Sequence, residues 1–353
     1  MNTIEKAVRY IKEPEALAKT MDFTLRTKDL EVPCEFVGAK TVRYQHIDFG
    51  DYDLGDFDRN NGYAAKDISL TWKEKTMTQD KGDSLKIDKM DDEEAMANGI
   101  VRITNRYIER VQTPAVDRYR LGVLAAAPRA NVVNATLTAE NIIQSLLKGR
   151  TMIVNSHFSL ANTVLYITAT ADGILEEAAF NKGYISMGNW NGNMDATVRM
   201  FKEAKKIVVP DDYFTNANVQ AGLLNTDAVP AMKKYQESEY FDKIPGFGGR
   251  RAQADVGIYH ECFAYDELNR AIVVFLKATS TTNTVTYAGG AGASGTAPTQ
   301  AATAPGAEYV LKANTFTLDG KTFVGWDDGS NLYKAGATYV MPNSAVTLTA
   351  RWK

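Results

Sequence analysis

Residues 91–128 read DDEEAMANGIVRITNRYIERVQTPAVDRYRLGVLAAAP, and this stretch decides the fold class. Its apolar residues recur at intervals of three or four: Met96, Ile100, Ile103, Tyr107 and Val111. Such spacing places them on one face of a helix and predicts a single buried stripe. The acidic residues 91–94 stand where a helix dipole favours negative charge. We therefore expect one long helix to begin here.

The predicted helix runs from Asp92 to Ala127, which would make it about 50 Å long. Pro114 is expected to kink or interrupt it, and Pro128 to end it. A helix of this length exceeds what a compact globular domain uses. It favours an extended molecule.

Residues 41–90, directly before the helix, predict a long hairpin. Ile68, Leu70 and Trp72 alternate as in a strand, Leu85 and Ile87 form the return, and Gly82 lies in a turn-like segment. The hairpin has little apolar content, and isolated hairpins are only marginally stable. We expect a partner surface to stabilise it. The candidate subunit-interface residues are its aromatic side chains: Phe49, Tyr52, Phe57, Tyr63 and Trp72.

The rest of the chain before residue 279 predicts a mixed α/β region. The expected elements are a short helix at 3–12, a helix at 138–149 with a Thr138 cap and a Gly149 stop, a strand and helix at 163–178, a strand at 206–209 cut by Pro210, and two strands joined by the turn 265–270.

Composition excludes several classes of protein. The chain has 353 residues, 44% of them hydrophobic and 24% charged, as in ordinary folded proteins. Its 40 basic and 43 acidic residues give a net charge of −3, which argues against binding nucleic acid through overall charge. The longest apolar run, 271–276, is far too short to span a membrane and predicts a buried strand. No signal-peptide pattern begins the sequence, so we expect synthesis in a cytoplasm.

No motif predicts catalysis, a cofactor or a metal. His260 and Cys262 would share one face of a strand and Glu261 the other, and no third ligand is spaced to join them. The acidic segment 56–67 fails the calcium-loop pattern, because its glycine stands one residue late and its last ligand is not Glu. Cys34 and Cys262 exclude a disulfide scaffold by number. We expect no enzyme activity.

The order of segments resembles the tailed-phage major capsid proteins of the HK97 fold. Residues 44–96 look like that family's extended E-loop and the start of its spine helix, and the similarity covers residues 1 to about 278. It implies an α+β fold. The implied parts are an N-terminal arm (1–40), an E-loop (41–90), and a P-domain with spine helix and A-domain (91–278), followed by a linker (279–283) and a C-terminal domain (284–353).

The C-terminal segment resembles the Listeria–Bacteroides (InlB B-type) repeat. The matching pieces are TVTYAGG, FVGWDDG, YKAGATYVMP and VTLTARW within 284–353, a segment that holds nine of the 26 glycines. The similarity implies a small β-rich, β-grasp-like domain. Its expected core residues are Trp326, Tyr339, Leu348 and Trp352.

Together these resemblances imply a bacteriophage coat protein. Hexamers and pentamers would self-assemble into an icosahedral virion capsid around double-stranded DNA, without sequence-specific contacts. A separate scaffolding protein and a portal are the implied partners, with no membrane. The C-terminal domain would be displayed on the outer surface, where it could bind the host or other ligands. The rivals are an encapsulin-like nanocompartment shell, a bacterial surface adhesin and an enzyme. Lys66, Lys73, Lys75 and Lys81 cannot be assigned to the family's covalent crosslink.

Overall fold

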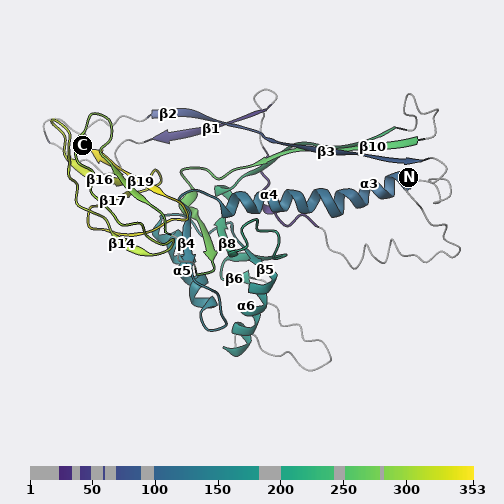
Figure 1. The fold of residues 1–353 in the computed structure, drawn as a ribbon, viewed down its shortest axis with the longest axis horizontal. Helices are drawn as coiled ribbons and strands as arrows, with labels where there is room; N and C mark the ends of the chain where they lie inside the picture. Colours follow the sequence, from purple (N-terminus) through teal and green to yellow (C-terminus); the bar gives the residue numbers. More distant parts are fainter. Residues whose placement is uncertain are drawn as a thin grey trace. The chain divides into compact units, whose positions relative to one another are not determined.

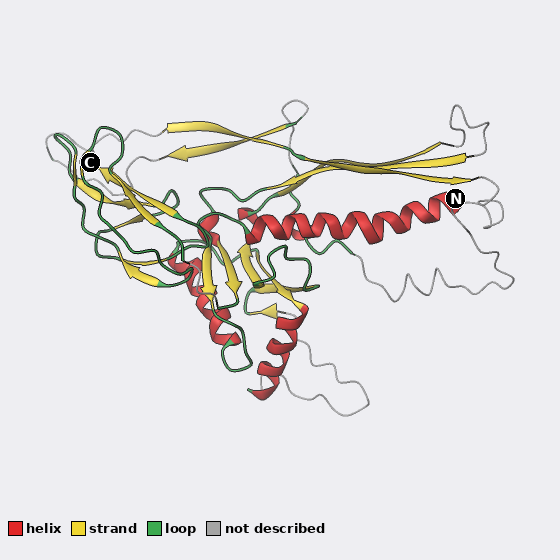
Figure 2. Ribbon diagram, in the orientation of Figure 1, coloured by secondary structure: helices red, strands yellow, loops and turns green. Residues whose placement is uncertain are grey.

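The computed structural model describes residues 24–33, 40–48, 59, 69–88, 99–182, 200–241, 251–278 and 282–353. The chain divides into two compact units, each described here by itself. Unit 1 comprises Met1–Val42, Lys75–Arg120 and Ala231–Cys262, and unit 2 comprises Arg43–Glu74, Leu121–Pro230 and Phe263–Lys353. Figure 1 labels the helices and strands, and Figure 2 separates them by type.

A long helix belongs to unit 1 up to Arg120, and its last residues, 121–125, belong to unit 2. It consists of α3 (Gly99–Tyr107), a π-helical turn (Ile108–Gln112) and α4 (Thr113–Ala125), which follow one another directly. The wider turn lies just before Pro114, and the Thr113 hydroxyl donates to the Ile108 carbonyl at 3.0 Å. The interruption predicted from Pro114 is therefore confirmed, although the helix is not broken. Residues 91–98, the predicted start, lie outside the described residues.

The sheet of unit 1 is antiparallel, in the order β3-β10-β9. Its strands are β3 (Gln79–Asp88), β9 (Ala231–Phe241) and β10 (Arg251–Cys262). Alternate residues Ala254, Val256 and Ile258 of β10 are buried, and α3 runs alongside β3 and β10 (Figure 1). Tyr107 donates a hydrogen bond to Asp83, so the helix is also fastened to the sheet by a polar contact.

The predicted hairpin pairing is wrong. Strand β2 (Ser69–Thr76) pairs with β1 (Thr41–Asp48), whereas β3 pairs with β10. Gly82 is not in a turn: it lies inside β3, opposite Gly257. A Cβ at Gly82 would stand 2.6 Å from the Val256 carbonyl oxygen. The glycine is therefore required by close approach of the two strands rather than by a turn.

Unit 2 contains a six-stranded sheet in the order β4-β11-β8-β5-β7-β6. Its strands are β4 (Asn131–Asn134), β5 (Thr163–Thr168), β6 (Met200–Phe201), β7 (Ala204–Val209), β8 (Val219–Asn225) and β11 (Ile272–Leu276). Every residue of β5 and of β11 is buried, as expected for central strands. The predicted strands at 206–209 and 271–276 are thereby confirmed.

Helices α5 (Ile142–Asn155) and α6 (Ala169–Asn181) pack against this sheet. The predicted change from strand to helix within 163–178 is confirmed, with Thr168 as the N-cap of α6. The predicted Gly149 stop is wrong, because α5 continues past it to Asn155. A Cβ at Gly149 would lie 2.6 Å from Cζ of Phe275, so this glycine lets the helix approach the sheet. The predicted Thr138 cap is also wrong: Asn141 occupies the N-cap position, and its side chain makes no cap hydrogen bond to the helix.

The two strands predicted around the turn 265–270 both exist, as β10 and β11, but they belong to different sheets. The segment between them contains a short 3₁₀ turn, Asn269–Ala271. The local sequence pattern identified each strand, whereas the partner of each strand comes from a distant segment of the chain. The turn is therefore a junction rather than a hairpin loop.

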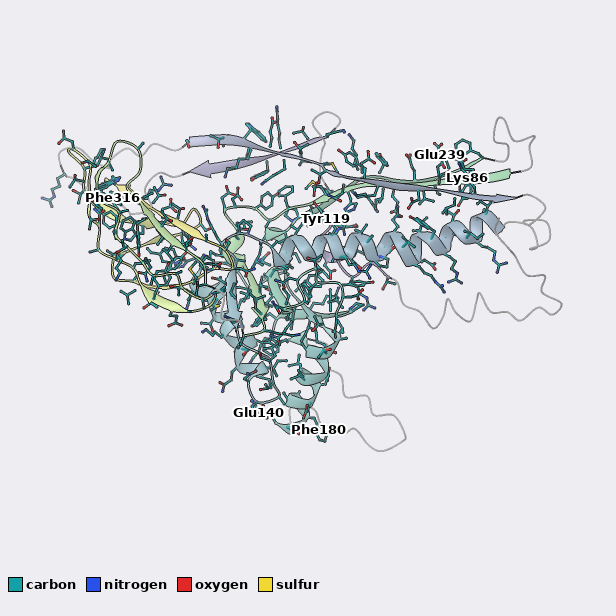
Figure 3. The ribbon with its side chains drawn as sticks, in the orientation of Figure 1. Lys86, Tyr119, Glu140, Phe180, Glu239 and Phe316 are labelled. Carbon is teal, nitrogen blue, oxygen red and sulfur yellow. The ribbon has the colours of Figure 1, made fainter. Side chains whose placement is uncertain are left out.

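The C-terminal part of unit 2 consists of strands, and no helix occurs between residues 282 and 353. Four strands form a sheet in the order β12-β19-β16-β17, and two further pairs are β13-β15 and β14-β18. The strands are β12 (Val285–Ala288), β13 (Ser294–Gly295), β14 (Glu308–Val310), β15 (Phe316–Thr317), β16 (Phe323–Asp327), β17 (Leu332–Tyr333), β18 (Thr338–Val340) and β19 (Val346–Trp352). Phe316 of β15 is labelled in Figure 3 and packs against the core cluster of this region.

Candidate interaction surfaces

Of the five predicted interface aromatics, only Trp72 lies among the described residues. Its side chain on β2 is 59% exposed, and Leu70, two residues earlier on the same strand, is 54% exposed. Residues two apart on a strand share a face, so these side chains form one apolar patch. We call Leu70 and Trp72 the hairpin patch. Phe49, Tyr52, Phe57 and Tyr63 lie outside the described residues.

The β1–β2 hairpin is fastened to the segment that follows β10. The Tyr44 ring lies 5.9 Å from the Phe263 ring and 4.7 Å from the Tyr265 ring, measured between centroids. The Lys73 ammonium group pairs with the Glu267 carboxylate. Apolar and charged contacts thus hold one part of the hairpin, while the hairpin patch stays exposed.

The expected core residues of the C-terminal domain cluster together. Trp326, Tyr339 and Leu348 are fully buried, and Trp352 packs at the margin of the same cluster. The Trp326 indole N–H donates to the Lys312 carbonyl at 2.8 Å. The Tyr287 and Phe323 rings pack edge-on against Trp326, at 4.7 and 5.0 Å between centroids. Burial alternates along β19, as its sequence pattern predicts.

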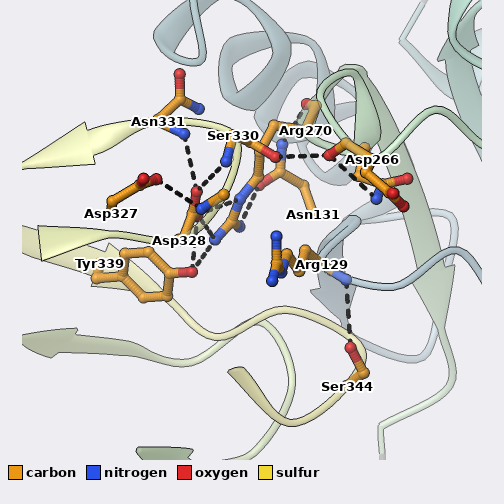
Figure 4. Close-up of polar contacts among 12 residues, drawn as sticks. Arg129, Asn131, Asp266, Arg270, Asp327, Asp328, Ser330, Asn331, Tyr339 and Ser344 are labelled. Atoms are coloured by element: carbon orange, nitrogen blue, oxygen red, sulfur yellow. Dashed lines mark hydrogen bonds and ion pairs between the residues drawn. The ribbon is translucent and has the colours of Figure 1, made fainter. Parts of the chain in front are cut away.

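A buried charged network joins this cluster to the six-stranded sheet (Figure 4). Arg270 donates to the Asp328 carboxylate from Nε at 3.0 Å and from Nη2 at 2.7 Å. Arg270 Nη1 donates to the Asn131 side-chain oxygen at 3.0 Å, and the Asn131 amide donates back to the Arg270 carbonyl at 2.7 Å. The Tyr339 hydroxyl donates to Asp328 at 3.0 Å. We call Asn131, Arg270, Asp328 and Tyr339 the docking network.

Both charges of the docking network are removed from solvent: Arg270 is 2% and Asp328 0% exposed. Burial by itself raises the pKa of Asp328. Arg270 and the backbone N–H groups of Asn331 and Ser330 outweigh this effect and hold the pKa below its ordinary value. Burial lowers the pKa of Arg270, but Tyr339 and Asp328 raise it by a larger amount, so the pKa lies above its ordinary value. The pair is therefore ionised and bonded on both sides.

Sequence reasoning missed the docking network. Arg270 stood in a predicted turn and Asp328 in a glycine-rich segment, 58 residues apart. The available signal was a charged residue directly before the apolar run 271–276 and another directly after the Trp326 strand. A charge at the end of a buried strand is one that the fold must pair.

A second buried polar cluster, in unit 1, anchors the end of the N-terminal segment. Asp117 accepts from the Arg26 and Thr27 backbone amides at 2.9 and 3.0 Å, and from the Thr27 hydroxyl at 2.7 Å. Burial raises the pKa of Asp117, and these bonds with nearby Arg120 work in the opposite direction. Arg120 also pairs with Glu31 at 3.0 Å. Residues 26–31 are thus fixed to α4.

The His260–Glu261–Cys262 triplet makes internal contacts. Glu261 accepts from the Thr78 amide at 2.7 Å and its hydroxyl at 2.9 Å, and from Tyr119, which projects from α4 (Figure 3). Burial, with Arg120 nearby, lowers the pKa of His260 to about 4. Burial raises the pKa of the Cys262 thiol to about 12, which suppresses the reactive thiolate. These groups hold the sheet and helix together.

Among the residues that the structure describes, no group of three or more His, Cys, Asp or Glu could hold a metal ion. The segment 56–67, tested as a calcium loop, lies outside the described residues except for Arg59. Within the described helices, none has the length and apolar character needed to cross a membrane.

The fold matches solved structures of phage capsids. The capsid structure of the cyanophage P-SCSP1u aligns with a TM-score of 0.59 at 11% identity, covering 79% of this chain and 93% of that one. The mature capsid of bacteriophage PhiM1 aligns with a TM-score of 0.55 at 11% identity, covering 80% and 92%. A Mycobacterium phage Bobi structure aligns with a TM-score of 0.51 at 8% identity, covering 72% and 91%.

Sequence comparison adds nothing to this match, because no family model and no curated protein matches the chain. Identities this low establish the fold alone. The chain has a mixed α/β fold that matches the folds of these phage capsid structures.

Proposed function

We propose that this chain is the major capsid protein of a tailed phage. The observation that carries the proposal is the capsid fold, which spans nearly the whole length of the P-SCSP1u and PhiM1 chains. The exposed hairpin patch supports it, because a thin hairpin that presents a tryptophan needs a neighbouring surface. In the proposed shell, the adjacent subunit supplies that surface.

The proposed assembly is a closed icosahedral shell of hexamers and pentamers around double-stranded DNA. Repeated heterologous contacts closed by symmetry make weak individual interfaces collectively strong. A separate scaffolding protein and a portal would take part, and the virion would be the final location. The C-terminal domain (284–353), after the linker (279–283), would face outward and be available to host or other ligands.

Negative-stain electron microscopy of the purified protein, with sedimentation alongside, tests this function. Closed shells or rings of six and five subunits, formed with or without a scaffolding protein, are the expected result. A compact monomer under both conditions would contradict it. The alternative is an encapsulin-like shell, and shells from infected cells that contain packaged enzymes rather than DNA would favour that alternative.

A substitution in the hairpin patch tests the predicted interface. Trp72→Ala is expected to lower assembly by about tenfold or more, because buried interface aromatics carry a large share of binding energy. The thermal midpoint of the unassembled subunit should stay unchanged, since Trp72 is 59% exposed. Val310→Ala on β14 is the control, with the same exposed fraction on the C-terminal domain. Equal assembly of both variants would remove Trp72 from the interface.

A further inference from the structure

The segment 263–271, which we call the junction turn, contacts two other parts of unit 2. One is the β1–β2 hairpin. Tyr44 packs on Phe263 and Tyr265, and Lys73 pairs with Glu267. The Lys73 and Glu267 side chains are only partly exposed, which lets the pair work with less screening than a surface pair.

The other part is the C-terminal domain. Arg270 of the junction turn forms the buried pair with Asp328, and the Ser330 hydroxyl donates to the Asp266 carbonyl at 3.1 Å (Figure 4). The Arg270 guanidinium also lies over the Tyr339 ring, 4.7 Å from its centroid. The C-terminal domain therefore binds both the side chain and the backbone of the turn.

Separating the junction turn from the C-terminal domain would cost a large amount of free energy. Departure would leave Arg270 and Asp328 buried without partners, or would expose the apolar residues around them. Short internal bonds also make the turn stiff: the Leu268 amide donates to the Tyr265 carbonyl at 3.0 Å, and the Ala271 amide to the Leu268 carbonyl at 2.8 Å. A stiff turn that is held at Asp266 and Arg270 also fixes Phe263, Tyr265 and Glu267.

We propose that the C-terminal domain positions the β1–β2 hairpin through the junction turn, with the Arg270–Asp328 pair as the clamp. The domain then does more than decorate the subunit: it sets the direction from which the hairpin patch meets its partner. That consequence for assembly rests on the proposed shell function, whereas the clamp itself is a property of the single subunit.

Hydrogen–deuterium exchange on the full-length, unassembled protein tests the clamp. In Asp328→Asn, the amides of 41–48 and 69–76 are expected to exchange about tenfold faster or more, because the hairpin loses its fixed support. Asp327→Asn is the matched control. Asp327 pairs at 2.7 Å with Arg351 inside the C-terminal domain and makes no bond to the junction turn. This variant should leave hairpin exchange at the wild-type rate.

Two further variants distinguish the contact between hairpin and turn from the contact between turn and C-terminal domain. Glu267→Gln removes the charge that pairs with Lys73 between turn and hairpin, so it should speed exchange in β2. Arg270→Met with Asp328→Asn removes both charges without leaving one unpaired, and it serves if Asp328→Asn alone does not fold. Because the clamp is still absent, hairpin exchange in this variant should stay faster than in the wild type. Wild-type hairpin exchange in either Asp328→Asn or Glu267→Gln would overturn the clamp. Failure of the shell function would be recognised separately, as absence of shells from the wild-type protein.

Discussion

At the scale of single residues, Asp328 illustrates how one side chain can have two partners. Its Oδ1 accepts from the Ser330 and Asn331 amides at 2.9 and 2.8 Å, which closes the loop after β16. Its Oδ2 accepts from Arg270 and Tyr339. An asparagine retains the first set of bonds and loses the charge that Arg270 requires. The two roles can therefore be separated by substitution.

Asp328→Asn is expected to lower the free energy of unfolding by about 3–5 kcal/mol, the usual cost of removing one partner of a buried ion pair. The double variant Arg270→Met with Asp328→Asn should lose less than Asp328→Asn alone, because no unpaired charge remains. Denaturant unfolding of the wild type, both single variants and the double variant measures this difference. Additive losses would show that the two residues do not interact energetically.

The same pair predicts a dependence on pH. The pKa of Asp328 is held below its ordinary value of 3.8 in the folded protein. Its contribution to stability is therefore complete above that value and is lost as pH falls through the lower, folded pKa. Thermal unfolding between pH 6 and pH 2 should show a steeper acid loss in wild type than in Asp328→Asn. Parallel curves would contradict this assignment.

At the scale of elements, the pairing of β3 with β10 places two glycines, Gly82 and Gly257, opposite each other. A Cβ at Gly82 would stand 2.6 Å from the Val256 carbonyl oxygen. A Cβ at Gly257 would have as its nearest neighbours only the side chains of Tyr235 and Glu237, at 3.9 and 4.0 Å. Backbone cannot move aside as a flexible side chain can. The two glycines therefore tolerate substitution differently.

Gly82→Ala is expected to destabilise the folded subunit by about 1–3 kcal/mol, because the added methyl forces β3 away from β10. Gly257→Ala, on the facing strand, should change stability by less than about 1 kcal/mol, since its Cβ makes ordinary contacts. Differential scanning calorimetry of the two variants provides the comparison. Equal midpoints would show that the strands separate without cost.

At the scale of the whole molecule, the C-terminal residues 284–353 and the part of unit 2 that holds the six-stranded sheet share one buried interface. The Arg129 amide donates to the Ser344 hydroxyl at 3.2 Å, and the Asn343 side chain donates to the Ala125 carbonyl at 2.9 Å. A Cβ at Gly306 would stand 2.6 Å from the Val132 carbonyl of β4. These contacts add to the docking network and bring the backbones of the two parts close together.

Truncation after Asn283 is accordingly expected to abolish most of the soluble, cooperatively folded protein. It leaves Arg270 without its buried partners Asp328 and Tyr339 and uncovers β4. Soluble yield and the thermal midpoint, measured beside the full-length chain, test this expectation. A truncated chain that melts at the wild-type temperature would show that the domain is an independent appendage.

The sequence by itself determined the elements that periodicity reports. The 3/4 spacing before Val111 identified the long helix, the run 271–276 identified a buried strand, and alternation identified β19. These patterns are local, because each concerns a single element. The predicted buried stripe of the helix is wrong: Ile103 and Val111 are 45% and 49% exposed in the subunit, whereas Thr104 and Gln112 are buried. The order of such elements was also enough to suggest the phage capsid fold.

Only the tertiary structure decided which elements meet. It placed Gly82 inside a strand rather than in a turn, paired β2 with β1, and put β10 and β11 in different sheets. It also joined Arg270 to Asp328 across 58 residues. Strand partners and buried charge pairs are set by the free energy of desolvating distant groups together, and no local period of the sequence records that choice.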